Sequence, residues 1–302
     1  GTVTTFGEVA VSELRDRADP DGDAKERVAA GVVAVLDEQS EEIHERYPEM
    51  KRNVSGYNLD RLVAEADGEY GETGVVNLAR LLAGSEGTLA IVTEATVSLE
   101  PLPETKSVAL LTYDSVLDAV SDVAHVLDHD PAAVELIDDV LIELASETTE
   151  FRDVVAKLPD RTEAALLIEF YADTDDAGRE KVAGLLADRV ADGAGTVADG
   201  DWAADGGAGG GIVSATDDGD RERYAFDALE AHDEADRTEL WKLRKSGQPI
   251  LLSRTSDAKH ISFLEDCAVP PEHLPEFVSE FQSVLEEHDT FAAFYAHAGP
   301  GV

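Results

Sequence analysis

The order of strand-like and helix-like segments after residue 104 most restricts what this chain can fold into. "SVALLTYDS" (107–115) and the alternating run "EAALLIEFYADT" (163–174) indicate strands, and helical spacing follows in residues 115–129 and 175–192. Between them, "PAAVELIDDVLIELA" (131–145) is typical of a strand that runs into a helix. Because strands alternate with helices in this order, we expect an α+β domain of ferredoxin-like topology, with an antiparallel sheet and helices on one face.

Two prolines, Pro101 and Pro103, mark a boundary that divides the chain into domains 1–103 and 104–302. In the first domain, apolar positions at helical spacing fill 23–47, and Pro48 ends that helix. In the second domain we further expect a mobile Gly, Ala and Asp-rich loop over 193–219, a long charged helix over 220–246, a strand over 260–270, a helix over 271–288 and a last strand over 290–302.

The charge of the chain is extreme, because 65 Asp and Glu oppose 24 Lys and Arg, for a formal net charge of −41. Nucleic acids and anionic membranes bind to cationic surfaces, so neither is an expected partner. Self-repulsion on such a surface destabilises the compact state, and salt at about 1 M screens it beyond roughly 3 Å. We therefore expect a protein adapted to a salt-rich cytoplasm.

The length and composition predict a globular protein. A chain of 302 residues with 43% hydrophobic content can form two cores. No apolar run reaches the roughly 18 residues of a membrane span, and no basic-then-apolar leader is present, which favours the cytoplasm. The single cysteine, Cys267, excludes an intrachain disulfide and a cysteine-only metal or cluster site within these residues.

The segment "LLAGSEGTLAIVTEATVSLEPLP" (81–103) places Gly84 and Gly87 around a Ser-Glu pair, directly before the apolar run 88–93. Glycine suits a sharp turn or a close approach of the backbone to another group. One interpretation is a tight turn that leads into a buried strand. The other is a turn that presents amide N–H groups to a phosphate. The Gly-x-x-Gly pattern by itself favours the tight turn.

Three basic residues stand out from the acidic background, namely Arg244 in "LWKLRKSGQP", Lys259 in "SDAKHIS" and His297 in "YAHAGPG". A guanidinium can bind a carboxylate through two hydrogen bonds, and Lys offers a compact cation. A histidine can act as an acid, a base or a metal ligand. From spacing alone, ion pairs with surface carboxylates explain Arg244 and Lys259 more simply, whereas a core role and a site role for His297 are evenly balanced.

Other titratable residues offer less. Glu265 and Asp266 are neighbours on an expected strand, so their side chains face opposite sides and cannot act as a pair. The histidines His44, His125 and His129 lack the spacing of metal ligands. We therefore expect no zinc site that is complete within the chain.

Five segments together resemble one family. In chain order they are "RNVSGYNLDRL" (52–62), "LLAGSEGTLAIVTEATVSLEPLP" (81–103), "LWKLRKSGQP" (240–249), "LEDCAVPPEHLPEFV" (264–278) and "FYAHAGPGV" (294–302). They are similar to the FAD-linked oxidases of the glycolate oxidase and D-lactate dehydrogenase type, above all to large members fused to an iron–sulfur region. The resemblance implies that 1–103 is the C-terminal half of a vanillyl-alcohol-oxidase-type FAD-binding domain. Residues 104–302 would be the cap that forms the substrate pocket.

The resemblance assigns the cofactor FAD to the first domain. Ser85, Glu86 and Gly87 would approach the adenosine-diphosphate part through backbone amides, since a side chain at Gly84 or Gly87 would block that approach. The remaining residues that the resemblance places against the flavin or its pocket are Asn53, Ser55, Gly56, Tyr57 and Ile91.

The resemblance also implies the chemistry of the second domain. Arg244 would clamp the carboxylate of a 2-hydroxy acid with Gln248 beside it, and Lys259 would take the carboxylate or the hydroxyl oxygen. His297 matches the first histidine of the family motif His-x-Gly-x-Gly-x-x-His, which helps to ligate a divalent metal or orients the α-hydroxyl while hydride leaves for flavin N5. The implied substrates are D-lactate, glycolate or D-2-hydroxyglutarate.

The chain departs from the family pattern at Pro300, where an aspartate often stands, and it lacks the second histidine of the motif, the N-terminal flavin half and the cluster cysteines. We therefore expect a portion of a longer protein, with little activity alone. The alternative is a non-catalytic α+β small-molecule-binding or scaffold module. The sequence leaves open the identity of the hydroxy acid, the electron acceptor and the oligomeric state, for which a homodimer is one expectation.

Overall fold

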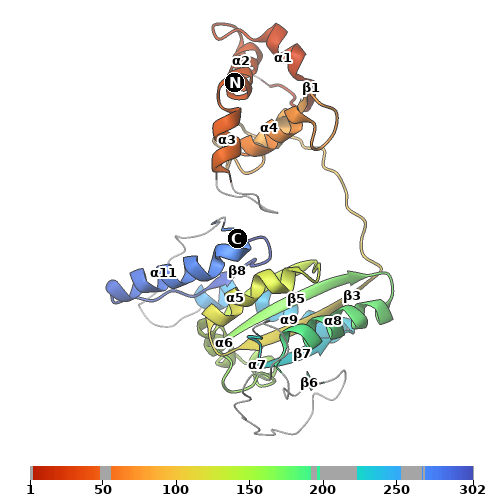
Figure 1. Cartoon of the computed structure of the whole chain (residues 1–302), viewed down its shortest axis with the longest axis vertical. Helices are drawn as coiled ribbons and strands as arrows, with labels where there is room; N and C mark the ends of the chain where they lie inside the picture. The colour runs from red at the N-terminus through yellow and green to blue at the C-terminus, as the bar shows by residue number, and fades with distance from the viewer. Residues whose placement is uncertain are drawn as a thin grey trace. The chain divides into compact units, whose positions relative to one another are not determined.

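The chain divides into two compact units, Gly1–Leu99 and Glu100–Val302. The computed structural model (Figure 1) describes residues 3–47, 56–191, 196–197, 223–252, 267 and 269–301. In this described part of the chain, no helix is long and apolar enough to cross a membrane.

The first unit is mainly helical. Its elements are β1 (Glu8–Ala10), α1 (Val11–Arg17), α2 (Ala24–Glu38), α3 (Ser40–Arg46), α4 (Leu59–Asp67), β2 (Val75–Asn77) and the 3₁₀ helix η1 (Leu78–Leu82). The strands β1 and β2 form an antiparallel pair. A capping box starts α2, because the Asp23 side chain accepts from the Glu26 N–H while the Glu26 side chain accepts from the Asp23 N–H. The helix expected over 23–47 is two helices, since α2 ends before Gln39 and α3 begins after it.

The prediction of a buried strand over 88–93 is wrong. The core of this unit consists of Leu14, Ala29, Val32, Leu62, Val76 and Leu78. Residues 88–99 contain no strand, and the Ile91 side chain is 91% exposed, with Val97 and Leu99 also exposed. A strand needs the backbone N–H and C=O groups of a neighbour, and no described strand pairs with this segment. Despite its alternating apolar pattern, this segment therefore joins neither described sheet.

The second unit is a sheet between helices. Its elements are β3 (Thr105–Tyr113), α5 (Val116–Leu127), β4 (Ala133–Asp138), α6 (Asp139–Ser146), α7 (Arg152–Val155), β5 (Ala164–Ala172), α8 (Asp175–Arg189), β6 (Thr196–Val197), β7 (Asp227–Ala231), α9 (Glu234–Lys245), α10 (Gly247–Leu252), the 3₁₀ helix η2 (Pro271–His273), α11 (Leu274–Glu287) and β8 (Tyr295–Ala296). The described strands have the order β6-β7-β3-β5-β4-β8, and all pairs except β6–β7 are antiparallel.

The expected antiparallel α+β domain is confirmed. The central order β7-β3-β5-β4 is the one that a ferredoxin-like β-α-β-β-α-β chain produces, with α5 and α8 as its two crossover helices. The expectation of helices on one face is wrong. One core cluster joins the sheet to α5, α8 and α11, and another joins its other face to α6, α7, α9 and α10. Both faces are covered because β5 is apolar on both, with Leu166 and Ile168 on one side and Leu167 on the other.

The prediction of a single helix over 220–246 is also wrong. Residues 227–231 form β7, which pairs with β3 in the register Leu110↔Leu229, and only 234–245 form a helix. Cross-strand pairing here overrides the helical preference of an Ala, Glu and Asp-rich segment. The strand expected over 260–270 and the loop over 193–219 lie mostly outside the described residues.

A buried polar cluster ties α5 and α8 to β3. The Arg189 Nε donates to Asp122 Oδ1 at 2.8 Å, and the Tyr113 hydroxyl donates to Asp122 Oδ2 at 2.8 Å. All three side chains are fully buried. Burial raises the pKa of the Asp122 carboxyl although the guanidinium opposes this, and burial also raises the pKa of Tyr113. The cluster therefore depends on each of its three members.

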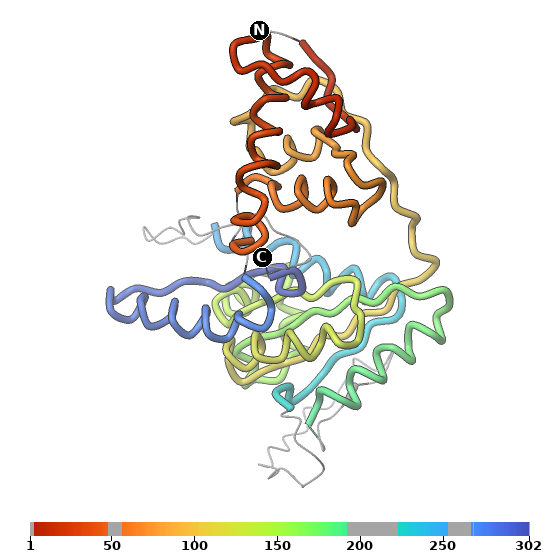
Figure 2. Tube along the Cα trace, turned by 45° about the horizontal axis from the view of Figure 1, so that its top comes forward, coloured from red at the N-terminus to blue at the C-terminus, as the bar shows by residue number. Residues whose placement is uncertain are grey.

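After α11 the chain runs back along the helix, as Figure 2 shows, and Phe294 meets Phe281 edge-on with ring centroids 5.9 Å apart. This return brings β8 to the edge of the sheet beside β4, with Ile137 opposite Tyr295 and Leu136 opposite Ala296. Side chains two residues apart on a strand share a face, so Glu135 and His297 lie opposite each other on the face that α9 covers.

Candidate functional site

Glu135 on β4 is the centre of a polar cluster that contains two of the predicted site residues. His297 Nδ1 lies 2.9 Å from each carboxylate oxygen of Glu135. Arg244 Nη2, from the last turn of α9, lies 2.8 Å from Oε2 of the same carboxylate. The structure therefore brings Arg244 and His297 together, although they are distant in sequence.

Two of the three side chains in this cluster are buried. The side chains of Arg244 and Glu135 are 4% and 6% exposed, whereas the His297 side chain is 50% exposed. The Arg244 guanidinium carbon lies 3.6 Å from the centre of the Tyr295 ring, which is a cation–π contact. The surface ion pair weighed above as the simpler explanation of Arg244 is therefore wrong, because its carboxylate partner is as buried as the guanidinium.

Two nitrogens of the cluster have no hydrogen-bond partner among the described residues. Among the described residues, no hydrogen-bond acceptor takes the buried Nε–H of Arg244. Buried donors without partners are costly, so an acceptor that reaches this nitrogen is stabilising. On His297, Nδ1 is the nitrogen that contacts Glu135, and Nε2 is the other ring nitrogen of a half-exposed side chain. The cluster thus offers a donor for a carboxylate and a ring nitrogen for a neighbouring hydroxyl.

Gly247 explains how the chain leaves α9 beside this cluster. A Cβ atom at this position would lie 2.4 Å from Tyr295 Cε2 and 3.1 Å from Leu141 Cδ2. The ring that stacks on Arg244 thus occupies the space of a side chain at 247. Glycine is therefore required here by packing, and its φ is not in the left-handed region.

The other residues predicted for the substrate are not joined to this cluster. Gln248 is exposed on α10, and no hydrogen bond between described residues connects its side chain to Arg244. Lys259 lies outside the described residues. No group of at least three His, Cys, Asp and Glu side chains within the described part could hold a metal ion, so His297 has no partners there for the predicted metal.

Asp138, three residues after Glu135, supports the same edge of the sheet from the opposite face. Its Oδ1 accepts from the Leu141 N–H at 3.0 Å and caps α6, and its Oδ2 accepts from the Phe294 N–H. The side chain is fully buried, and burial raises the pKa of its carboxyl to about 7. Asp138 thus links β4 to the segment that carries Tyr295 and His297.

In the first unit, the Gly-x-x-Gly segment forms the turn that the sequence predicts. Gly84, Glu86 and Gly87 have φ of +76°, +48° and +75°. The Ser85 N–H and hydroxyl both donate to the carbonyl of Leu82, so this amide is used within the turn. No acceptor in the described residues takes the N–H of Gly84, Glu86 or Gly87. Three backbone donors are therefore available at the turn.

The segment 56–58 lies against this turn. The Tyr57 hydroxyl lies 2.9 Å from Thr88 Oγ1, and Asn58 Nδ2 donates to the Ala83 carbonyl at 3.2 Å. The Gly56 carbonyl would lie 3.9 Å from a Cβ atom at Gly84. The structure therefore brings Gly56 and Tyr57 to the predicted cofactor turn. It does not do so for the exposed Ile91, and Asn53 and Ser55 lie outside the described residues.

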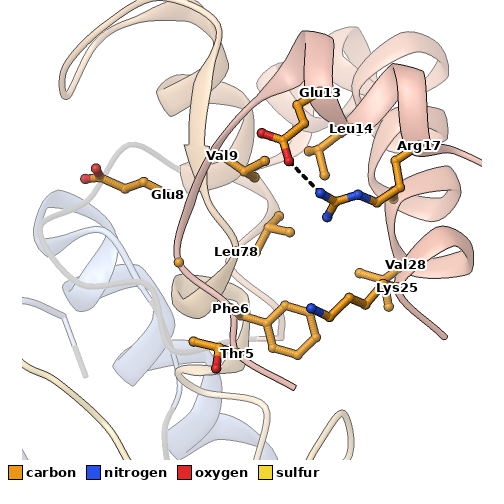
Figure 3. A pocket seen from close by; sticks show the side chains of 12 residues that line it. Thr5, Phe6, Glu8, Val9, Glu13, Leu14, Arg17, Lys25, Val28 and Leu78 are labelled. Atoms are coloured by element: carbon orange, nitrogen blue, oxygen red, sulfur yellow. Dashed lines mark hydrogen bonds and ion pairs between the residues drawn. The ribbon is translucent and has the colours of Figure 1, made fainter. Parts of the chain in front are cut away.

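The first unit also contains a cavity of about 170 Å³, which is separate from the turn at 84–87. Its lining includes Phe6, Leu14 and Leu78 but no residue of the turn. Figure 3 shows Arg17 paired with Glu13 beside this cavity. Sites for drug-sized ligands measure roughly 300–1,000 Å³, so this cavity is too small for a dinucleotide.

Comparison with known proteins gives the family of the chain. The family described as "FAD linked oxidases, C-terminal domain" matches residues 102–302. The chain belongs to the FAD-linked oxidases. The resemblance read from the sequence is therefore confirmed for this family.

Named relatives extend over most of this FAD-linked oxidase chain. A D-2-hydroxyglutarate dehydrogenase of Pantoea ananatis is 28% identical over 91% of the chain and 24% of the relative. The glycolate oxidase subunit GlcD of Bacillus subtilis is 27% identical over 74% of the chain and 40% of the relative. A mitochondrial D-lactate dehydrogenase [cytochrome] of Arabidopsis thaliana is 26% identical over 74% of the chain and 33% of the relative. The chain spans about a quarter of the length of the D-2-hydroxyglutarate dehydrogenase relatives.

Sequence reasoning missed Glu135, although a signal for it was present. "AVELID" (133–138) places a glutamate in the middle of an apolar strand. A charged residue in such a strand is buried unless the strand lies at the surface, and a buried charge needs a partner. The basic partners, Arg244 and His297, were the residues already singled out.

Proposed function

We propose that the chain is part of an FAD-dependent enzyme that oxidises a 2-hydroxy acid. The observation that carries the proposal is the joining of Arg244 and His297 through the buried Glu135. A 2-hydroxy acid has a carboxylate beside a carbon that bears a hydroxyl. A guanidinium donor next to an imidazole nitrogen matches that pair of groups. The names of the relatives favour D-2-hydroxyglutarate, D-lactate or glycolate as the substrate.

Each group has a separate task in this proposal. The Nε–H of Arg244, for which no described residue provides an acceptor, donates to the substrate carboxylate. His297 Nε2 accepts the proton of the α-hydroxyl as the alcohol becomes a carbonyl. When bound, FAD supplies the acceptor for the α-hydrogen and its electron pair. Burial of the guanidinium keeps water away and strengthens its interaction with the carboxylate. Gln248 and Lys259 are proposed as further contacts for the substrate.

The turn of the first unit fits the diphosphate of FAD. It has three N–H groups for which the described residues provide no acceptor, and left-handed backbone at both glycines. Backbone N–H groups in turns of this kind can bind phosphate oxygens. We therefore propose that Gly84, Glu86 and Gly87 hold the diphosphate, with Gly56 and Tyr57 nearby. We further propose that 1–103 is the C-terminal half of a vanillyl-alcohol-oxidase-type FAD domain and 104–302 its cap. The alternating segment 88–99, which pairs with no described strand, supports this, because a further strand would complete its pairing.

The test uses the full-length protein. We expect flavin absorbance and reduction of a redox dye with at least one of D-lactate, glycolate and D-2-hydroxyglutarate. Arg244→Ala should cost about 2–5 kcal/mol in kcat/KM, the range for truncation of one partner of a buried charge pair. Lys245→Ala is the matched control, because Lys245 is the exposed neighbour of Arg244 on the same helix. A colourless protein without turnover would overturn the proposal, and equal activity of both variants would favour a scaffold module.

The acidic composition supports a second part of the proposal. A net charge of −41 suits a solvent rich in salt, where self-repulsion is screened. A divalent metal at His297 stays a prediction and is the alternative to its role as a base, because both need Nε2. A cytoplasmic location, an iron–sulfur region elsewhere in a longer protein, the electron acceptor and a homodimer also stay predictions.

A further inference from the structure

Glu135 contacts two side chains at once, those of Arg244 and His297. Its Oε2 lies 2.8 Å from Arg244 Nη2, and both of its oxygens lie 2.9 Å from His297 Nδ1. We propose that Glu135 is a positioning residue that fixes the tautomer of His297 and holds Arg244 in place. This inference rests on the proposed function, because it assigns Nε2 of His297 as the nitrogen that meets the substrate hydroxyl.

The chemistry of the three side chains determines where the imidazole proton lies. An ionised carboxylate only accepts hydrogen bonds, and a guanidinium only donates them. A neutral imidazole facing a carboxylate through Nδ1 must therefore carry its proton on Nδ1 and leave Nε2 without one. The same device orients histidines in catalytic triads and in metal sites, where a carboxylate fixes the tautomer.

The position of Glu135 makes this preference strong. The carboxylate is 6% exposed, so little water competes for its oxygens. It lies on β4 one residue before Leu136, and His297 follows Ala296, the partner of Leu136 in the β4–β8 ladder. The guanidinium of Arg244 also contacts the Tyr295 ring, with its carbon 3.6 Å from the ring centre. Glu135 thus holds a base and a carboxylate-binding group in one rigid arrangement.

Glu135→Gln tests the proposal, because the amide has one accepting oxygen and one donating nitrogen. Arg244 can only donate, so the amide oxygen must take the place of Oε2, and the NH₂ group must take the place of Oε1. Nδ1 lies 2.9 Å from both places, so it meets a donor at one of them and an oxygen that already accepts from Arg244 at the other. The Nδ1–H tautomer thus loses part of its preference, and the substitution is expected to raise the share of the Nε2–H tautomer while it keeps the size of the side chain.

Glu169→Gln is the matched control. Glu169 is on the neighbouring strand β5, its side chain is also 6% exposed, and it bonds with Lys106 and Trp241 instead of the site. It therefore reports the cost of losing a buried carboxylate charge from this sheet. It should leave the His297 tautomer unchanged.

The first readout is the ¹⁵N NMR spectrum of histidine-labelled protein, recorded at a pH at which the imidazoles are neutral. The chain has 8 histidines, and His297→Gln assigns the signal of interest. We expect the Nδ1–H tautomer in the wild type and in Glu169→Gln, and a larger share of the Nε2–H tautomer in Glu135→Gln. An Nε2–H tautomer in the wild type overturns the proposal and requires no folded variant. An unchanged tautomer in Glu135→Gln overturns it too.

The second readout is turnover by the full-length enzyme with its preferred hydroxy acid. Glu135→Gln should lower kcat about 100-fold, the lower end of what a positioned base contributes, and Glu169→Gln should keep the wild-type kcat. Equal kcat in both variants overturns the positioning role. A wild type that oxidises none of the hydroxy acids overturns the proposed function instead, while the tautomer still decides the role of Glu135.

Discussion

Asp138 gives the second unit a pH dependence that can be predicted in sign and size. Burial raises the pKa of this carboxyl from 3.8 to about 7 in the folded chain. The folded state therefore holds a proton that the unfolded state releases between these two values. The contribution of Asp138 is fully present below the unfolded pKa, and it is lost as the pH rises through about 7.

The size follows from the difference between the two pKa values. One pKa unit corresponds to about 1.4 kcal/mol. For a shift from 3.8 to about 7, linkage predicts that the free energy of unfolding falls by about 2.5 kcal/mol between about pH 5 and about pH 8. Many other carboxylates also titrate, so the quantity to measure is the difference between the wild type and Asp138→Asn. The amide can still cap α6, since its oxygen can accept from the Leu141 N–H.

The assay is urea denaturation at one fixed, high KCl concentration, followed by tryptophan fluorescence. Trp241 on α9 belongs to the second unit, so its signal reports the unfolding of that unit. We expect the wild type to lose stability relative to Asp138→Asn as the pH rises. A difference that stays constant with pH would show that Asp138 is ionised in the folded chain and would refute the reasoning.

Three further predictions concern stability. Asp122→Asn should destabilise the second unit by about 3–5 kcal/mol in urea denaturation, because Arg189 loses a buried counter-ion; a loss below about 1 kcal/mol would contradict this. Gly247→Ala should cost about 1–3 kcal/mol, because its Cβ would overlap the Tyr295 ring, whereas Gly184→Ala, with nothing within 4 Å, should not destabilise α8. Raising KCl from about 0.1 M to about 1 M should raise the melting temperature. A melting curve that does not respond to salt would argue against salt adaptation.

The ferredoxin-like part of the second unit could be predicted because each of its segments has a strong local pattern. The strand at 164–172 and the helices at 116–127 and 175–189 lie close to their expected ranges. The strand at 227–231 could not be predicted in this way. Its Ala, Glu and Asp composition favours a helix, and only the ladder with β3 makes it a strand. The local pattern of the first unit misled for the opposite reason, since 88–99 alternates as a strand does but has no described neighbour.

The candidate site could be predicted only for the residues that differ from their surroundings. Arg244 and His297 were noticeable as basic residues in an acidic chain, and the structure brings them together. Glu135 was one acidic residue among 65 such residues, and composition gave it no distinction. What distinguishes it is burial opposite two basic groups, which depends on the β4–β8 pairing and on the return of the chain after α11.

The position of β8 as the outermost described strand of the sheet has a consequence for how activity is lost on heating. Glu135 and His297 are 162 residues apart in sequence, and the β8 strand beside β4 consists of only Tyr295 and Ala296. Such short terminal ladders open at lower free energy than the centre of a sheet. Fraying of this edge would separate the imidazole from its carboxylate while the rest of the sheet stays folded. Thermal inactivation should therefore precede melting, and deuterium uptake at residues 294–297 should follow the inactivation curve.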